Sequence, residues 1–427
     1  MGGCLDKGDK FSDIKEFYPM SIWRSYPKDL KVLLIAMLVN SIGMAFLWPL
    51  HTIYMTQAMG KTLSEAGFVL MLHSAAEIVG SFLGGYLYDR IRGKRTLLLA
   101  VLSSACFIFI ISMGMSWPIY IFMMILLGLG IGTIFPPIYA LAGVVWKEGG
   151  RKSFNLIYLV LNFGVAVGTA LGGVVAQFSF QYVFWVNGFT YLLFIFIVWF
   201  ALEEPDRDFG QVRERKDSFM RPIKEARPPL QSFHSLMILC LGFMFCWITY
   251  IQWQTSISNY MHQLGFSLSA YSALWTINGL LILLGQPLIQ WLMSRMKSPV
   301  KWQLLSGVFF FMATFALLSF SHSYGGFVMG MVIMTIGEIL IFPAVPAIAD
   351  RLAPLDRRGM YQGIVSGAAN VGRTIGPLLG GLLYDEFGTL VLLYACIFIC
   401  GFALICFGTF QRLQYSQKEV STLKVNK

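Results

Sequence analysis

Residues 162–173 read NFGVAVGTALGG, and residues 370–381 read NVGRTIGPLLGG. Both segments begin with Asn and carry Gly at the third, seventh, eleventh and twelfth positions, at a constant offset of 208 residues, which is 370 minus 162. A shorter match lies nearby, because Phe135-Pro136 returns as Phe342-Pro343, 207 residues later. Several matches in nearly one register indicate an internal duplication. The chain is therefore predicted to contain two copies of one structural unit.

Apolar runs long enough to cross a membrane recur along both copies. The chain is 56% hydrophobic and 13% charged, whereas a soluble domain carries about 25% charged residues. A helix needs about 20 apolar residues to cross a bilayer. Spans are expected at residues 31–55, 66–88, 96–114, 119–145, 153–176, 183–201, 235–257, 267–293, 302–321, 326–349, 360–384 and 390–411. These runs predict an all-α membrane protein with twelve transmembrane helices in two pseudo-symmetric six-helix bundles.

One long polar connection divides the two bundles. The domains expected are an N-terminal segment, an N-terminal bundle, a charged linker, a C-terminal bundle and a tail, at residues 1–30, 31–201, 202–234, 235–411 and 412–427. Each bundle has an even number of spans, so both copies have the same orientation. Parallel repeats of this kind are a transporter design, in which the substrate path lies between the halves.

The positions of the basic residues predict the orientation in the membrane. If the N-terminus is cytoplasmic, 30 of the 32 Lys and Arg residues fall in cytoplasmic segments, while Lys61 lies outside and Arg373 lies within a span. Short loops retain Lys and Arg on the cytoplasmic side during insertion. We therefore expect a multi-pass protein of the cell membrane with both termini and the linker in the cytoplasm. The net charge of +10 is then explained by orientation, and no nucleic-acid partner is predicted.

The sequence gives no sign of a metal, a cofactor or an enzyme active site. Six of the seven cysteines lie in apolar runs and none lies in a predicted external loop, so no disulfide is expected. Cys396 and Cys400 are one helical turn apart, but no His or carboxylate lies near them in sequence, and packing is the preferred interpretation. We find no nucleophile motif, no metal-ligand spacing and no P-loop, which argues against a membrane-embedded enzyme.

A charged loop follows the second span and carries a family resemblance. Residues 85–95 read GYLYDRIRGKR, which resembles the loop signature G-x-x-x-D-R-x-G-R-K/R of the major facilitator superfamily, with one residue read as inserted before Gly93. The gating loop implied by this resemblance consists of Gly85, Asp89, Arg90, Lys94 and Arg95. Asp89, at a helix end, can bond unpaired backbone groups or pair with Arg across the domain interface. The alternative is a plain loop that is basic only because it is cytoplasmic. The second-half copy has Ser294 in place of the Asp.

The glycine-rich fifth span narrows the resemblance. It is similar to G-x-x-x-G-P-x-x-G-G, the signature of the drug:proton antiporters in this family, although Thr169 replaces the Pro. Small residues one turn apart let helices pack closely, so generic packing is the alternative. The family's span 4 usually carries an Arg before a Gly pair, and this chain has none there. The helix-packing residues are Gly164, Gly168, Gly172 and Gly173 in the fifth span, and Gly372, Gly376, Pro377, Gly380 and Gly381 in the eleventh.

The resemblance implies a function for the whole chain. It implies a monomeric transporter that alternates between inward- and outward-open states and exports small hydrophobic or cationic compounds in exchange for protons. A proton-coupled importer of a small solute and a flippase for a lipid-linked solute stay open as alternatives, because fold does not fix function. A receptor that transports nothing would be favoured if the buried carboxylates affected no flux.

Ionisable residues inside the spans are the candidates for proton coupling. Each costs roughly 2.5–3.5 kcal/mol at mid-membrane on insertion scales, so each should have a partner or a function. Glu77 and Glu338 are the only carboxylates expected there, and both lie near the middle of the bilayer. His73 shares a helix face with Glu77, and Arg373 is predicted to be the only buried cation. Either Glu could carry the proton; alternatively, Glu338 and Arg373 form a static pair.

Polar and aromatic residues within the spans are candidates for the substrate cavity. Aromatic rings there would suit apolar or cationic guests, while packing and interfacial anchoring are the alternatives. The candidates are Asn40, Tyr158, Asn162, Trp247, Tyr250, Gln254, Trp275, Asn278 and Asn370.

Overall fold

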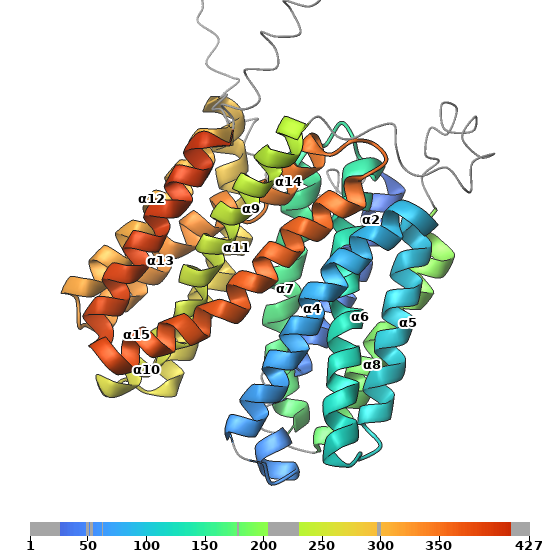
Figure 1. The fold of residues 1–427 in the computed structure, drawn as a ribbon, viewed down its shortest axis with the longest axis horizontal. Helices are drawn as coiled ribbons and strands as arrows, with labels where there is room; N and C mark the ends of the chain where they lie inside the picture. Colours follow the sequence, from blue (N-terminus) through green and yellow to red (C-terminus); the bar gives the residue numbers. More distant parts are fainter. Residues whose placement is uncertain are drawn as a thin grey trace, which may run out of the picture.

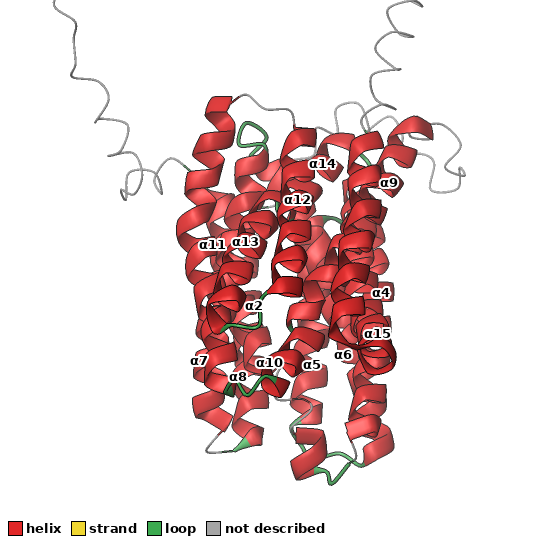
Figure 2. Ribbon diagram, turned by 90° about the vertical axis from the view of Figure 1, so that its left-hand side faces the viewer, coloured by secondary structure: helices red, strands yellow, loops and turns green. Residues whose placement is uncertain are grey.

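The computed structural model describes residues 26–47, 51, 54–61, 63–176, 179–203, 230–296 and 300–410. Residues 1–25, most of the predicted linker (204–229) and the tail from residue 411 lie outside the described residues, as do a few short internal stretches. Within the described part every regular element is a helix, and the long helices run broadly in one direction (Figure 2). Nine of the described helices are long and apolar enough to cross a membrane.

The helices follow the predicted spans closely. Those of the N-terminal half are α2 (Lys28–Leu47), η2 (Tyr54–Ala58), α4 (Leu63–Ile91), α5 (Gly93–Ile111), α6 (Trp117–Val145), α7 (Arg151–Ala176) and α8 (Phe180–Ala201). Those of the C-terminal half are α9 (Leu230–Tyr250), η4 (Ile251–Trp253), α10 (Ser256–Gln263), α11 (Leu268–Met296), α12 (Val300–Phe320), α13 (Tyr324–Ile341), α14 (Ala344–Leu352) and α15 (Arg358–Thr409). The order agrees with the expected duplication of a six-helix unit, with α15 covering the last two spans.

Local sequence explains where several helices begin, break and turn. Ser179 and Ser323 cap α8 and α13, since their hydroxyls accept from the amides of Gln181 and Gly326. The predicted span 326–349 is divided between α13 and α14 because Pro343 has no amide hydrogen to continue the ladder. Within α15 the backbone reverses at Gly388, whose φ of 80° favours glycine.

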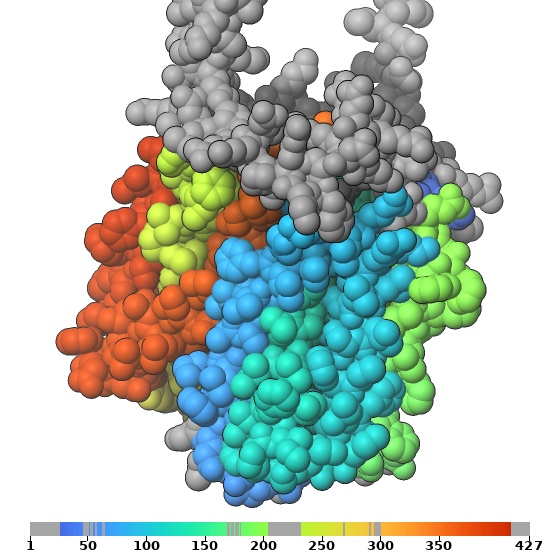
Figure 3. Space-filling model, turned by 45° about the vertical axis from the view of Figure 1, so that its right-hand side comes forward, coloured from blue at the N-terminus to red at the C-terminus, as the bar shows by residue number. Residues whose placement is uncertain are grey.

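Each half has its own hydrophobic core. One cluster of buried side chains joins residues of α2 to α8, and a second joins residues of α9 to α15. The two halves of the chain lie on different sides of the molecule (Figures 1 and 3). Tyr158 is the exception, because it belongs to α7 yet packs in the cluster of the C-terminal half. Large apolar side chains such as Phe196, Trp199 and Phe200 are exposed on the outside of α8, as expected for a surface that faces lipid.

The predicted glycine motifs lie where helices approach closely. A Cβ on Gly164 or Gly168 would overlap α2, and one on Gly376 would overlap the side chain of Ile251. Gly372 and Gly380 likewise face Trp247 and Gln252, whereas Gly381 has open space around it and Pro377 lies inside α15. Gly172 and Gly173 belong to α7, but their surroundings lie outside the described part. In both halves the stripe thus joins the fifth helix of the unit to the first.

The two halves meet mainly at one end of the molecule. The ribbons of α4 and of the first part of α15 approach each other at the end where α14 lies and diverge toward the opposite end (Figure 1). A Cβ on Gly85 would overlap the carbonyl of Gly359, and one on Gly363 would press on the carbonyl of Ser81. Close backbone contact therefore joins the halves at this end.

Candidate functional site

Glu338 is the centre of a buried hydrogen-bond cluster. Its side chain is 2% exposed. Tyr158 and Tyr250 donate their hydroxyls to Glu338 Oε1 at 2.5 and 3.0 Å, and Asn278 Nδ2 donates to Oε2 at 2.8 Å. Asn278 Nδ2 also lies 2.9 Å from Thr335 Oγ1. Four helices, α7, α9, α11 and α13, thus converge on one carboxyl group, and the Tyr158 bond crosses from one half to the other.

This geometry suits the ionised form of Glu338. A carboxylate only accepts hydrogen bonds, and three donors point at its two oxygens. A protonated carboxyl carries a hydrogen that needs an acceptor, and the Asn278 amide nitrogen cannot accept one. Protonation therefore requires one of these donors to turn: a tyrosine hydroxyl reverses its bond, or the Asn278 side chain rotates to offer its oxygen. The link between Tyr158 and Glu338 is consequently sensitive to one proton.

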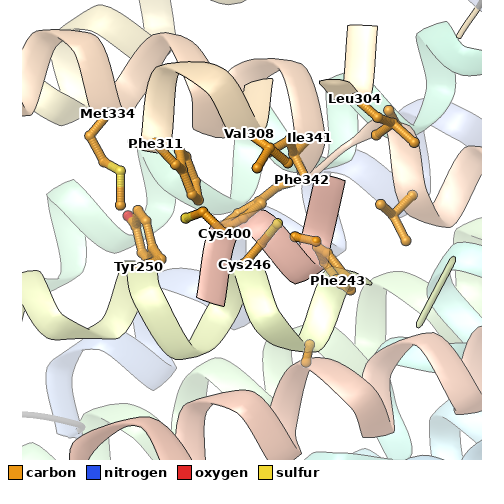
Figure 4. Packing of buried hydrophobic residues seen from close by; sticks show 14 of the residues in the cluster. Phe243, Cys246, Tyr250, Leu304, Val308, Phe311, Met334, Ile341, Phe342 and Cys400 are labelled. Carbon is orange, nitrogen blue, oxygen red and sulfur yellow. The ribbon is translucent and has the colours of Figure 1, made fainter. Parts of the chain in front are cut away.

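Aromatic rings surround this cluster. The Phe342 ring stacks on Trp247 with centroids 4.5 Å apart and meets Tyr250 at 5.1 Å. Tyr250 also has Trp275 at 6.3 Å. Figure 4 shows Tyr250, Phe311 and Phe342 in the adjoining apolar core. Phe342 lies between the end of α13 and Pro343, and its ring belongs to the aromatic wall formed with Trp247 and Tyr250.

Arg373 does not pair with Glu338, so the predicted static pair is not formed among the described residues. Its guanidinium instead donates to Asn370 Oδ1 and lies 5.0 Å above the Trp247 ring. Its side chain is exposed, although it belongs to the span predicted at residues 360–384. It interacts electrostatically with Glu77, across the interface between the halves. The cation therefore belongs to the environment of the other carboxylate.

The second buried carboxylate, Glu77, is paired with a histidine. His73 Nε2 lies 3.5 Å from Glu77 Oε1, and both side chains are buried. His73 Nδ1 lies 2.8 Å from the Met124 carbonyl oxygen, which only accepts, so this nitrogen carries hydrogen. One further proton can be shared between His73 Nε2 and Glu77. Ser81 and Asn370, which bond each other at 3.1 Å, join α4 to α15 one turn further along.

The remaining cavity candidates differ in their surroundings. Asn162 donates to the Tyr158 carbonyl at 2.9 Å and so lies beside the Glu338 cluster. Asn40 is buried, and its amide contacts the sulfur of Met44 at 3.3 Å. Gln254 is exposed after η4. The structure thus gathers Tyr158, Asn162, Trp247, Tyr250, Trp275, Asn278 and Asn370 around the meeting of the halves and leaves Asn40 and Gln254 apart.

The gating loop forms a clasp between the halves. Asp89 accepts hydrogen bonds from the backbone amides of Gly359 and Met360 at 2.9 and 2.8 Å, at the first turn of α15. A carboxylate is stabilised there by the unpaired amides and the helix dipole. We call this contact, with the close approach of Gly85 to Gly359, the α4–α15 clasp.

The other loop residues stay within the N-terminal half. Lys94 donates to the carbonyls of Trp199 and Leu202, both at 2.8 Å, and so holds the end of α8. Arg90 lies 5.2 Å over the Tyr86 ring, and Arg95 is exposed. Arg92 has a φ of 81° and a ψ of 154°. It occupies the place where the family signature has Gly, so a substitution explains the departure more simply than the predicted insertion before Gly93.

On the other edge of the interface the link is different. Arg151, at the start of α7, donates to the side-chain oxygen of Gln303 in α12. Within the C-terminal half, Arg358 Nη1 and Asp350 Oδ1 form an ion pair at 3.6 Å. Asp350 also faces Gly143 of α6, in the other half.

Two groups of residues at these sites were not selected from the sequence. Thr335 and Phe342 complete the Glu338 cluster. The repeat of Phe135-Pro136 as Phe342-Pro343 was a usable signal for the latter. His51 lies beside the His73–Glu77 pair, with the two imidazole centroids 6.2 Å apart. Nothing in its local pattern distinguishes it from other polar residues near span ends.

Comparison with known proteins places this arrangement among transporters. The model of the Major Facilitator Superfamily matches residues 33–359 and, in an overlapping match, 254–425. The uncharacterized MFS-type transporter YttB of Bacillus subtilis (strain 168) is 42% identical over 401 residues, covering 94% of this chain and 98% of that protein. Multidrug resistance protein 2 of the same organism is 22% identical and covers 83% of this chain and 88% of that protein. The crystal structure of the human organic anion transporter MFSD10 (TETRAN) has a TM-score of 0.71 at 15% identity, covering 89% of this chain and 99% of that one.

Proposed function

Because this chain belongs to the major facilitator superfamily, we propose that it is a secondary transporter that exports small hydrophobic or cationic compounds in exchange for protons. The observation that carries the proposal is the buried Glu338 carboxylate, which accepts hydrogen bonds from helices of both halves. A titratable group in that position links its own protonation to the contact between the halves. The more distant similarity to a multidrug resistance protein supports the same direction of transport.

The conformation described here, with the α4–α15 clasp formed, is one of the two states of the proposed cycle. If the termini are cytoplasmic, the α4–α15 clasp closes the cytoplasmic side. A proton from outside neutralises Glu338 and weakens the hydrogen bond that it accepts from the Tyr158 hydroxyl. The halves then rearrange, and the proton is released inside as substrate binds. One charge moving down 100 mV supplies about 2.3 kcal/mol, which can drive export.

The aromatic wall beside Glu338 supports the proposed substrate class. Trp247, Tyr250 and Phe342 offer ring faces within a few ångströms of a carboxylate. Ring faces attract organic cations and also bury apolar groups. A cation and a proton would compete for the same negative charge, which is a simple basis for exchange.

A flux assay tests the proposal. Purified protein in proteoliposomes should move a fluorescent organic cation such as ethidium uphill when a pH gradient is imposed. Glu338→Gln keeps the shape of the side chain but cannot titrate, so uphill transport should be lost, while downhill exchange of ethidium persists with weaker binding of the cation. The matched control is Glu65→Gln, which changes a carboxylate near the start of α4 and should leave both activities intact.

Two results would oppose the proposal. Full gradient-driven transport by Glu338→Gln, by Glu77→Gln and by the double variant would remove both carboxylates from coupling. Uphill movement of ethidium in the same direction as the proton flux would assign import instead of export.

A further inference from the structure

A line of buried polar side chains runs through the N-terminal half toward Glu77. The Tyr120 hydroxyl lies 3.5 Å from His51 Nδ1. The imidazole rings of His51 and His73 have centroids 6.2 Å apart, and His73 Nε2 lies 3.5 Å from Glu77 Oε1. All four side chains are at most 7% exposed. Such a row of groups that exchange protons is costly inside an apolar bundle, and it calls for a function.

The far end of this line lies close to the predicted outer surface. The Tyr120 ring stacks on Trp117 with centroids 5.9 Å apart, and the Lys61 ammonium lies 4.9 Å from the Trp117 ring. Trp117 is the first residue of α6, and Lys61 lies just before α4. The line therefore leads from the helix ends to the middle of α4 without passing between the two halves.

The groups around the line leave the two histidines in different settings. Phe184 of α8 packs against His51, with ring centroids 6.3 Å apart. The exchangeable groups beside His51 are the Tyr120 hydroxyl and the His73 imidazole. Glu77 is faced by His73 and also interacts electrostatically with Arg373 of α15 and with Tyr191 of α8. Because His73 Nδ1 is held by the Met124 carbonyl, only its Nε2 side is available for exchange.

We propose that Tyr120 and His51 relay protons between the outer surface and the His73–Glu77 pair, along a path inside the N-terminal half that is separate from the substrate path. This proposal rests on the proton coupling proposed above. In one step His51 Nδ1 takes the Tyr120 hydroxyl proton, while the opposite ring nitrogen gives up its own proton toward His73 Nε2 or Glu77. The Tyr120 oxygen is itself buried, so in this proposal it regains a proton from outside by way of the half-buried Tyr54, whose ring centroid lies 5.8 Å from that of Tyr120. A rotation of the His51 ring or one bridging water molecule spans the distance between the two imidazoles.

A separate proton path has a clear advantage for exchange. A substrate that fills the space between the halves would block water from reaching a carboxylate there. Glu77 can load a proton through the relay whether or not that space is occupied. Proton entry and substrate binding then need not wait for each other.

The test compares proton flux with substrate exchange in the same proteoliposomes. His51→Gln and Tyr120→Phe remove the exchangeable groups and keep similar volumes. We expect substrate-driven proton flux, followed with a pH-sensitive dye inside the vesicles, to fall by about tenfold or more. Downhill ethidium exchange should stay near its normal rate. Added imidazole should restore part of the proton flux in His51→Gln, because a small base can replace the missing ring.

The control is His322→Gln. His322 is an exposed histidine whose Nδ1 lies 2.7 Å from the Tyr260 hydroxyl, so it matches the His–Tyr pair without belonging to the line. Normal proton flux in both His51→Gln and Tyr120→Phe, with coupling abolished by Glu77→Gln, would overturn the relay and leave the proposed function standing. Equal loss of proton flux and exchange without imidazole rescue would assign a purely structural role and would also overturn the relay. Normal coupling in Glu77→Gln would remove the end point of the relay and overturn it, while the proposed function would still stand or fall with Glu338→Gln.

Discussion

At the scale of single residues, Arg92 holds a backbone conformation that glycine adopts more easily. Its φ of 81° and ψ of 154° lie in a region that costs a side chain on the order of 1–3 kcal/mol. Arg92→Gly should therefore stabilise the protein by about 1 kcal/mol, after the greater freedom of glycine in the unfolded chain is subtracted. A higher midpoint of thermal unfolding in detergent would show this. Arg90→Gly, inside α4, should lower the midpoint, and equal effects of the two changes would contradict the explanation.

Residue-level roles were the hardest to predict from the sequence. The buried carboxylates Glu77 and Glu338 stood out because charges are rare in apolar spans. His73 was found as a neighbour of Glu77 from helical spacing. The partners of Glu338 were not, since the Tyr158–Glu338 bond joins residues 180 positions apart and depends on how two bundles dock. The alternative pair of Arg373 with Glu338 is not formed among the described residues, and Arg373 instead interacts with Glu77. Helical spacing fixes neighbours along one helix, but not across an interface.

At the scale of helices, the glycine stripe of α15 should be measurable as packing energy. A Cβ at Gly376 would overlap Ile251 and approach the Ile248 carbonyl, whereas one at Gly381 would meet open space. Gly376→Ala should cost about 1–3 kcal/mol by forcing α9 and α15 apart. Gly381→Ala gains the same helix propensity without the overlap and serves as the matched control. Thermal unfolding of both variants measures the difference, and similar stability in the two would rule out close packing at Gly376.

The helices themselves were largely predictable. Long apolar runs and the repeated glycines specify spans and their tight pairs directly, because both depend on nearby residues. The division of the tenth span at Pro343 and the reversal of α15 at Gly388 also follow from local chemistry. The length of α4, which continues to Ile91 through the charged loop, was less apparent, since Asp89 and Arg90 resemble a loop in sequence.

At the scale of the whole molecule, the α4–α15 clasp should control the rate of switching. Asp89→Asn replaces one of two accepting oxygens with an amide nitrogen, which cannot accept, so one of the two hydrogen bonds from Gly359 and Met360 is lost. Turnover in a transport assay should slow, with substrate affinity nearly unchanged. Asp29→Asn is the control, because Asp29 accepts from the Glu203 amide at 3.0 Å within one half. Weaker binding with normal turnover in Asp89→Asn would place this residue in the substrate site instead.

The orientation of the whole molecule is a separate prediction from the distribution of Lys and Arg. A cysteine placed at Lys61 should react with an impermeant thiol reagent added to intact cells, and one placed at Arg215 should react only after the cells are permeabilised. Labelling of Arg215→Cys in intact cells would reverse the topology. The end closed by the α4–α15 clasp would then face the outside of the cell.

The two halves of the chain are copies, but the contacts that join them differ between the two edges of their interface. The α4–α15 edge is held by a carboxylate on a helix terminus, whereas on the other edge Arg151 donates to the neutral side chain of Gln303. Ser294 stands where a second Asp would restore the symmetry. We therefore expect the two halves to separate unevenly, with the edge that carries Arg151 and Gln303 opening before the α4–α15 edge. Spin-label distances measured across each edge would reveal this torsion, and equal opening on both sides would exclude it.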